Sequence, residues 1–259
     1  MLKWLFKIFV ELTGNRFMSR LLIRVTTSKW SRIFIPLFVK VYHINQAEMK
    51  LPLSEYHSLQ HLFTRELKSE IRAIDNHKHV IVSPVDGVVS AFGSVSEVEK
   101  YKVKNRQLNL EEMLGSEEIA ATYKKGKYII LYLSPHHYHR IHSPVKGRIT
   151  NSWTLGGKSY PVNSLGIKYG NKPLSTNRRT VTEIESELQN IAVVKVGALN
   201  VNSIHLTNQS KELEPGDELA YFSFGSTVIL LMENEHLQFA TNVTVGEEIK
   251  YGERLLFLN

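Results

Sequence analysis

A short proline-containing corner occurs twice in this chain, at residues 83–89 (SPVDGVV) and again at 143–149 (SPVKGRI). In each copy the proline ends the pairing of one strand, and the glycine allows the turn that leads into the next. A second pair of related segments lies at 216–221 (GDELAY) and 246–251 (GEEIKY). Repeats of this kind predict a duplicated β-structure in which the two Ser-Pro-Val corners are related by pseudo-symmetry.

From residue 79 onward the sequence consists of short β-branched runs bounded by Gly and Pro, which is the pattern of strands. We expect one helix near 109–114, and strands at 79–83, 87–94, 127–134, 137–142, 147–153, 191–197, 201–206, 219–223 and 227–233. The paired Ser-Pro and Gly-acidic elements resemble the small β-sandwich of lipoyl and biotinyl carrier domains. That resemblance implies an α+β, mainly β protein whose core is a duplicated sandwich of this type.

Three regions are expected along the chain: helices at 1–45, a helical connector at 46–78 and a β-rich catalytic domain at 79–259. The connector has apolar residues at helical spacing: Leu59, Leu62, Phe63 and Leu67. A chain of 259 residues can bury one substantial core. Cysteine is absent, which excludes disulfides, thiolate zinc sites and cysteine nucleophiles.

The positive charge is concentrated in residues 1–45. They contain eight Lys and Arg against one acidic residue, Glu11, and this difference equals the formal net charge of +7 of the whole chain. Large apolar residues alternate with the cations, so that the first helix has an apolar face made of Leu5, Ile8, Phe9 and Leu12. Cationic amphipathic helices lie in the membrane interface and are attracted to anionic lipids.

Residues 1–45 are therefore expected to bind an anionic membrane surface; the alternative is that their apolar faces pack on the protein's own core. No stretch approaches the roughly 18 uncharged residues needed to cross a bilayer, and no signal-peptide cleavage site follows the first helix. Nucleic acid is not an expected partner, because the cations alternate with large aliphatic residues instead of forming an open polar face.

Near the C-terminus, a Gly-Ser-Thr step separates an aromatic-rich strand from a leucine-rich one, at residues 224–227 (FGST). Gly225 permits strained backbone angles and leaves its carbonyl accessible, and the hydroxyl of Ser226 can reach that carbonyl. Attack would convert the peptide bond into an ester, and elimination from this ester would leave a pyruvoyl group. Taken alone, the tetrapeptide is more typical of a β-turn or bulge.

Four of the eleven histidines lie within residues 136–142 (HHYHRIH). No carboxylate is near them in the sequence, so a metal centre is not expected, and His136 is interpreted as a surface residue. A serine nucleophile needs a base, and the base needs a third group that fixes its tautomer. His142 leads into one corner and Asp86 lies inside the other. If the corners face each other, these two residues can pair, with Ser226 delivered from a third segment.

The segments 63–68 (FTRELK), 83–87 (SPVDG), 139–144 (HRIHSP) and 224–227 (FGST) resemble the signature segments of phosphatidylserine decarboxylases. The resemblance runs from about residue 50 to the end and includes 158–163 (KSYPVN) and 196–201 (VGALNV). It has three departures, none on an expected reacting group. Phe224 replaces a leucine, Asn202 replaces a glycine, and Lys104-Asn105 replaces a Lys-Gly turn.

This resemblance implies that Asp86 orients His142 and that His142 deprotonates Ser226, so that the chain cuts itself between Gly225 and Ser226. The products would be a β chain, 1–225, and an α chain, 226–259, whose first residue becomes a covalent pyruvoyl cofactor. The pyruvoyl group would form a Schiff base with phosphatidylserine and accept electrons as CO2 leaves, giving phosphatidylethanolamine. His139 is the candidate for protonating the resulting carbanion.

The resemblance also implies an α–β heterodimer, which could pair into a dimer of heterodimers, acting peripherally at the cytoplasmic face of the cell membrane. Two other functions stay open. A lipoyl-like carrier or membrane scaffold would need a modified lysine, for which Lys146 is the candidate, and a His-rich metallohydrolase would need a bound metal.

Overall fold

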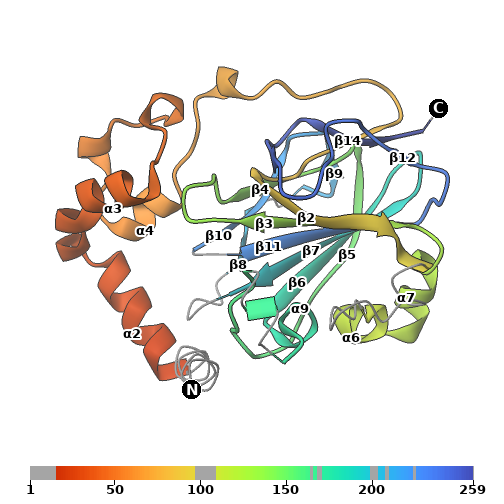
Figure 1. Ribbon diagram of the computed structural model, residues 1–259, viewed down its shortest axis with the longest axis horizontal. Helices are drawn as coiled ribbons and strands as arrows, with labels where there is room; N and C mark the ends of the chain where they lie inside the picture. The colour runs from red at the N-terminus through yellow and green to blue at the C-terminus, as the bar shows by residue number, and fades with distance from the viewer. Residues whose placement is uncertain are drawn as a thin grey trace.

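A computed structural model describes residues 16–96, 109–163, 166–167, 171–198, 204–207, 210–223 and 226–258, to which all structural statements refer. The expected helix within 1–15 and residues Phe224 and Gly225 of the expected cleavage site lie outside these ranges. Two α-helices, α2 (Arg16–Thr27) and α3 (Ile35–Tyr42), are joined by the 3-10 helix η1 (Lys29–Phe34). Together they form an arm at one side of the β-rich body (Figure 1).

The connector that follows the arm is mostly irregular. Its described helices are short: η2 (Gln46–Glu48), η3 (Leu53–Glu55), α4 (Leu59–Phe63) and η4 (Ser69–Ile71). Leu62 and Phe63 are buried, but Leu67 forms a β-bridge with Met49 instead of continuing the helix. The helical character expected for the connector is therefore limited to these short elements.

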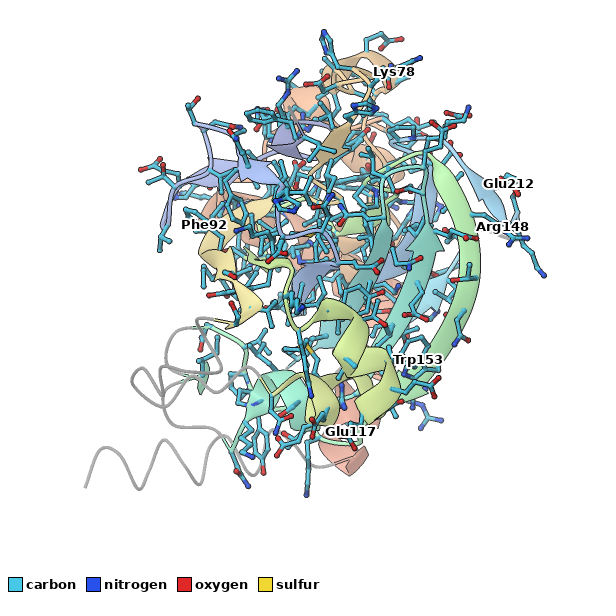
Figure 2. All side chains as sticks on the ribbon, turned by 90° about the vertical axis from the view of Figure 1, so that its right-hand side faces the viewer. Lys78, Phe92, Glu117, Arg148, Trp153 and Glu212 are labelled. Carbon is cyan, nitrogen blue, oxygen red and sulfur yellow. The ribbon has the colours of Figure 1, made fainter. Side chains whose placement is uncertain are left out.

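An eight-stranded antiparallel sheet forms the centre of the body, in the order β13-β2-β3-β11-β7-β6-β5-β9. Its strands are β2 (Gly87–Ser94), β3 (Lys127–Leu133), β5 (Gly147–Leu155), β6 (Arg179–Glu185), β7 (Asn190–Gly197), β9 (Glu212–Leu213), β11 (Ser226–Met232) and β13 (Glu248–Ile249). Arg148 of β5 and Glu212 of β9 are paired at one edge of this sheet (Figure 2).

Two three-stranded sheets cover one face of the large sheet. The first contains β1 (Val80–Val82), β14 (Arg254–Phe257) and β12 (Gln238–Phe239), and the second contains β4 (Arg140–His142), β10 (Glu218–Phe222) and β8 (Ile204–Leu206). The opposite face is covered by α6 (Leu110–Leu114) and α7 (Glu117–Tyr123), and α9 (Pro173–Thr176) lies close to α6. Trp153 of β5 donates its indole N–H to the Leu114 carbonyl at 2.9 Å, on the helical side (Figure 2).

Strand β11 is buried on both faces because it lies inside the large sheet. Val228 and Leu230 pack against the small sheets, while Ile229 and Leu231 pack against the helices. This alternation is the period of two that a strand imposes. The continuous apolar run that predicted a strand at 227–233 is thus explained by burial on both sides.

The two Ser-Pro-Val corners lie against each other. The Val82 N–H donates to the Pro144 carbonyl at 2.9 Å, and the His142 N–H donates to the Pro84 carbonyl at 2.8 Å. The second repeat is shifted from its expected position. Gly216 and Gly252 each donate an N–H to the serine carbonyl of one corner, so the structural counterpart of 216–217 is 252–253, not 246–247.

Candidate active site

Two chain connections join the large sheet to the sheet of β4 and β10, and the described residues at their ends are neighbours. Residues 134–139 join β3 to β4, and residues 223–225 join β10 to β11. Ser226 is paired with Leu133 at one end, and the Phe222 N–H donates to the His139 carbonyl at 2.9 Å at the other. The histidine-rich segment and the expected cleavage segment are therefore neighbours at both ends.

Ser226 is the first residue of β11 and has no exposed surface. Its cross-strand neighbours are Leu133 and Gly197, and its Oγ is buried without a hydrogen-bond partner among the described residues. A buried hydroxyl without a partner costs about 1–3 kcal/mol, so its retention needs a reason. This hydroxyl becomes a nucleophile only when a base removes its proton.

His142 is buried, and both of its ring nitrogens are hydrogen-bonded. Nδ1 lies 2.6 Å from the Gly216 carbonyl oxygen, and because a carbonyl can only accept, Nδ1 carries the proton. Nε2 then accepts from the Tyr138 hydroxyl at 3.1 Å. Burial lowers the pKa of His142, against the opposing effects of the Gly216 carbonyl, Glu218 and Asp86. The ring is thus held neutral, with its basic nitrogen on the Nε2 side.

Asp86 does not hydrogen-bond to His142. Its Oδ2 forms an ion pair with Arg72 Nη2 at 2.5 Å, and its Oδ1 accepts from the Tyr251 N–H at 2.9 Å. The Tyr251 ring stacks on the His142 imidazole, with centroids 4.1 Å apart and planes at 8°. Tyr251 therefore connects the two predicted residues: its main chain binds the carboxylate and its ring contacts the base.

His139 is completely buried, and its ring centroid lies 3.9 Å from that of Phe63. Its Nδ1–H donates to the His137 carbonyl at 2.9 Å, and its Nε2 has no hydrogen-bond partner among the described residues. Burial, and after it the charge of Arg65, lowers the pKa of His139 well below its usual value. His139 is thus a neutral imidazole with an unoccupied basic nitrogen.

One group in the described chain has the spacing of a metal site: His136, His137 and Glu248, whose ligand atoms lie within 4.8 Å of one another. Both imidazole Nε2 atoms approach the same carboxylate oxygen, at 3.1 and 3.3 Å. However, Nδ1 of His137 accepts from the Ser134 N–H at 2.8 Å, which leaves the ring proton on Nε2. That nitrogen is a donor to Glu248, and the arrangement is a hydrogen-bonded cluster and not a set of free metal ligands.

Main-chain contacts place Ser226 beside Leu133, His139 beside Phe222, and the corner that contains Asp86 against the corner that follows His142, but the expected chain of hydrogen bonds is not seen among the described residues. No hydrogen bond joins Asp86 to His142, or His142 to Ser226, in the described part of the molecule. The roles predicted for these residues therefore stay predictions.

The sequence reading missed three side chains of this site: Arg72, Tyr138 and Tyr251. Tyr138 stands between two histidines of the 136–142 run, and Tyr251 ends the GEEIKY repeat, so both had a signal in the sequence. Nothing in the sequence around Arg72 indicates that it pairs with Asp86.

Comparison with known proteins gives consistent results. The phosphatidylserine decarboxylase family model matches residues 59–257. A phosphatidylserine decarboxylase proenzyme of Anoxybacillus flavithermus is 48% identical over 258 residues, which cover 100% of this chain and 97% of the relative. A protein of the same name from a Geobacillus species is 47% identical, over 100% of this chain and 100% of the relative. Another, from Bacillus thuringiensis, is 46% identical, over 98% of this chain and 97% of the relative. The chain therefore belongs to the phosphatidylserine decarboxylase family.

Proposed function

We propose that this chain is a phosphatidylserine decarboxylase that cuts itself between Gly225 and Ser226 and converts phosphatidylserine into phosphatidylethanolamine. The observation that carries the proposal is the buried Ser226 Oγ, which has no hydrogen-bond partner among the described residues; Ser226 itself pairs with Leu133, next to the histidine-rich segment. Family membership supports the same reading, because the relatives are named as proenzymes.

The proposed cofactor is the pyruvoyl group formed from Ser226 itself. The partnerless hydroxyl fits its precursor, because no competing hydrogen bond must be broken before attack on the Gly225 carbonyl. Such a group supplies a ketone that serves as an electron sink while CO2 leaves a bound amino acid.

His142 is proposed as the base that takes the Ser226 proton at Nε2. Its tautomer is suited to this role, because the Gly216 carbonyl holds the other ring proton at Nδ1. Asp86 would support it indirectly, through its charge and through the main chain of Tyr251. His139, with a free Nε2, would take a proton from the substrate's ammonium group and return it to the product.

The arm is proposed to bind the surface of the membrane. An exposed apolar stripe runs along η1 and α3 with helical spacing: Trp30, Ile33, Phe34, Leu37 and Val41. Exposed cations flank it at Arg24, Lys29, Arg32 and Lys40. Among the described residues, no helix combines the length and the hydropathy needed to cross a membrane. Peripheral binding to an anionic leaflet, on the cytoplasmic face of the cell membrane, fits this combination.

The two chains left by the cut would stay together as a heterodimer. Residues 226–232 lie in the middle of the large sheet, between β3 and β7, and every one of them is buried. Strand β14 of the smaller chain pairs with β1 of the larger one. We further propose that the repeated corners belong to a duplicated lipoyl/biotinyl-like sandwich, and that heterodimers can pair.

The proposal is tested by intact-mass measurement of the wild type and of Ser226→Ala. The wild type is expected to give two chains, the smaller one beginning with a keto group, whereas Ser226→Ala stays at full length. Ser223→Ala is the matched control, because its hydroxyl lies three residues away and is bonded to His205 and Gln60. An uncut wild-type chain with decarboxylase activity would overturn the proposal.

A further inference from the structure

A cavity of about 200 Å³ lies where the segment after α3 meets the β-body. It is lined by His43 and Glu48 from that segment, by Arg65 and Arg72 from the connector, and by Asp86 and His137 from the body. Ligand pockets for drug-sized molecules usually have about 300–1,000 Å³. At about 200 Å³ this cavity is smaller than that range, so it could hold at most a fragment such as a lipid headgroup, and acyl chains would remain outside it.

Most charges around the cavity are paired within the protein. Arg72 forms ion pairs with both Asp86 and Glu48. The imidazole of His137 is bonded to Glu248. These contacts leave Arg65 as the buried cation of the cavity that has no carboxylate partner.

Arg65 is 4% exposed. Of its three guanidinium nitrogens, only Nη2 donates hydrogen bonds to described residues. Nη2 donates to the carbonyls of His136 and His137, at 2.7 and 3.0 Å. Its Nε and Nη1 are buried with no acceptor in the described chain. A buried guanidinium with two unused donors is unfavourable unless a ligand supplies the missing acceptors.

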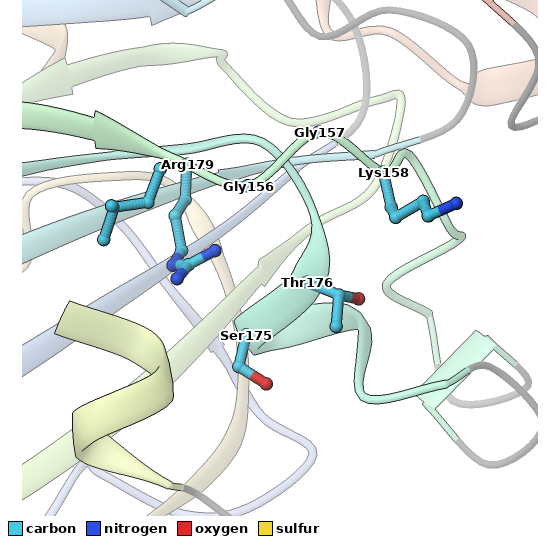
Figure 3. A pocket seen from close by; sticks show the side chains of 7 residues that line it. Gly156, Gly157, Lys158, Ser175, Thr176 and Arg179 are labelled. Atoms are coloured by element: carbon cyan, nitrogen blue, oxygen red, sulfur yellow. The ribbon is translucent and has the colours of Figure 1, made fainter. Parts of the chain in front are cut away.

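Arg179 shows how a buried arginine with a structural role is satisfied. It is 3% exposed and lies in a surface depression beside Ser175 and Gly156 (Figure 3). Its Nε, Nη1 and Nη2 donate to the carbonyls of Met113, Asn177 and Glu112. Arg65 is buried to a similar degree, but two of its three nitrogens, Nε and Nη1, have no acceptor among the described residues.

We propose that Arg65 binds the phosphodiester group of the lipid headgroup in this cavity, an inference that rests on the proposed function. The planar guanidinium matches the paired oxygens of a phosphate. The substrate's carboxylate is a poorer candidate. Its charge disappears as CO2 leaves, so an ion pair to it would stabilise the ground state and slow the reaction. The phosphodiester keeps its charge throughout.

The surroundings of the cavity support this assignment both on the side next to α3 and on the side next to His139. His43 is the C-cap of α3, whose Leu37 and Val41 belong to the exposed apolar stripe. A lipid held with its chains along that stripe would bring its headgroup to the cavity. On the inner side, Arg65 lies close enough to influence the pKa of His139. The phosphate and the reacting end of the headgroup could thus be held at the same time.

The first experiment measures binding without catalysis, in a Ser226→Ala background that cannot form the cofactor. Calorimetry with glycerophosphoserine, the soluble headgroup diester, is expected to show binding that Arg65→Gln weakens about tenfold or more, since charge-assisted hydrogen bonds are lost. Arg65→Lys keeps the positive charge but loses the planar pair of N–H donors. Its affinity for the diester is expected to lie between that of the protein with Arg65 and that of Arg65→Gln. Inorganic phosphate is the second probe, and it should bind more weakly than the diester.

Equal affinity for inorganic phosphate and the diester would overturn the headgroup assignment. Unchanged diester binding in Arg65→Gln would overturn the role of Arg65. This measurement needs no decarboxylation. If binding depends on Arg65 but the wild-type protein has no decarboxylase activity, the proposed function is contradicted and the anion site is not.

The second experiment uses the self-cleaved enzyme with phosphatidylserine in mixed micelles. Arg65→Lys is expected to raise KM about tenfold with kcat within about threefold, because a contact that is equal in the ground and transition states affects binding alone. Arg179→Lys is the matched control and should leave KM unchanged. A fall in kcat at constant KM would show that Arg65 only braces the histidine segment, and would overturn the proposal.

Discussion

The Tyr251 ring lies flat on the imidazole of His142, with 4.1 Å between the centroids and 8° between the planes. The main chain of Tyr251 donates to Asp86 at the same time. Tyr251 therefore contacts both the predicted acid, Asp86, and the predicted base, His142, which do not hydrogen-bond to each other.

Replacing Tyr251 with Ala is expected to slow self-cleavage about two- to tenfold, because an aromatic pair contributes about 0.5–1.5 kcal/mol. Tyr251→Phe keeps the stacking and the main-chain donor, so it should cleave at the wild-type rate. Precursor disappearance is followed on a denaturing gel. Tyr221→Ala is the control, since Tyr221 stacks on His205, with centroids 4.6 Å apart. Equal rates in Tyr251→Ala and the wild type would rule out a role for the stacked ring.

Asp86→Asn is expected to lower the free energy of unfolding by about 1–3 kcal/mol, because buried Arg72 loses one of its two carboxylate partners. Self-cleavage should also slow, since the Asp86 charge helps to support protonated His142. Urea unfolding and gel assays measure the two effects. Asp75→Asn breaks a more exposed ion pair, with Arg254 at 2.7 Å, and should lower stability without slowing cleavage. Cleavage of Asp86→Asn at the wild-type rate would contradict the role of the charge.

Lys195→Met is expected to stabilise the protein at neutral pH. Lys195 is fully buried on β7 with only Thr182 Oγ1 and the Val193 carbonyl as partners, and burial lowers its pKa to about 7. Between this value and the usual pKa of 10.5, the unfolded chain binds more protons than the folded one, so wild-type stability rises with pH across that window.

The gain from Lys195→Met should therefore be largest at pH 7 and below, about 2–4 kcal/mol, and should disappear above about pH 10.5. Thermal unfolding of both proteins at pH 7 and pH 10.5 measures the difference. Lys146→Met, at a side chain that is 70% exposed, should leave the stability unchanged at both pH values. A gain that does not depend on pH would mean that packing, and not the charge, limits stability at this position.

Membrane binding should depend on the exposed stripe of the arm. The double variant Trp30→Ser/Ile33→Ser is expected to lower partitioning into phosphatidylserine-containing vesicles at least tenfold, because each large apolar side chain contributes about 1.5–3 kcal/mol when buried. Leu206→Ser/Val245→Ser removes two exposed apolar side chains elsewhere on the surface, at 55% and 58%, and should bind like the wild type. Vesicle sedimentation measures both, and equal losses in the two variants would argue against a specific membrane face.

Most strands were predictable from the sequence because their signals are local. Each of the nine expected strands overlaps an observed one, and the bounds of β2, 87–94, agree at both ends. Gly and Pro mark where such strands stop, and β-branched runs mark their interiors. The strands β6 and β14 and the helices α7 and α9 were missed, as were the edge strands β9, β12 and β13, which have two residues each and carry little pattern of their own.

The sequence by itself indicated part of the candidate site: the Gly-Ser step, the histidine run and the two corners are short motifs whose chemistry can be recognised without coordinates, whereas Arg72, Tyr138 and Tyr251 were not predicted. The tertiary structure alone decided how they are connected. Arg72 donates to the Asp86 carboxylate, and the Gly216 carbonyl accepts the hydrogen bond of the His142 Nδ1–H, across separations of 14 and 74 residues. A hydrogen-bond partner is chosen by proximity in space, and a buried polar group bonds to whichever acceptor the packing brings within reach.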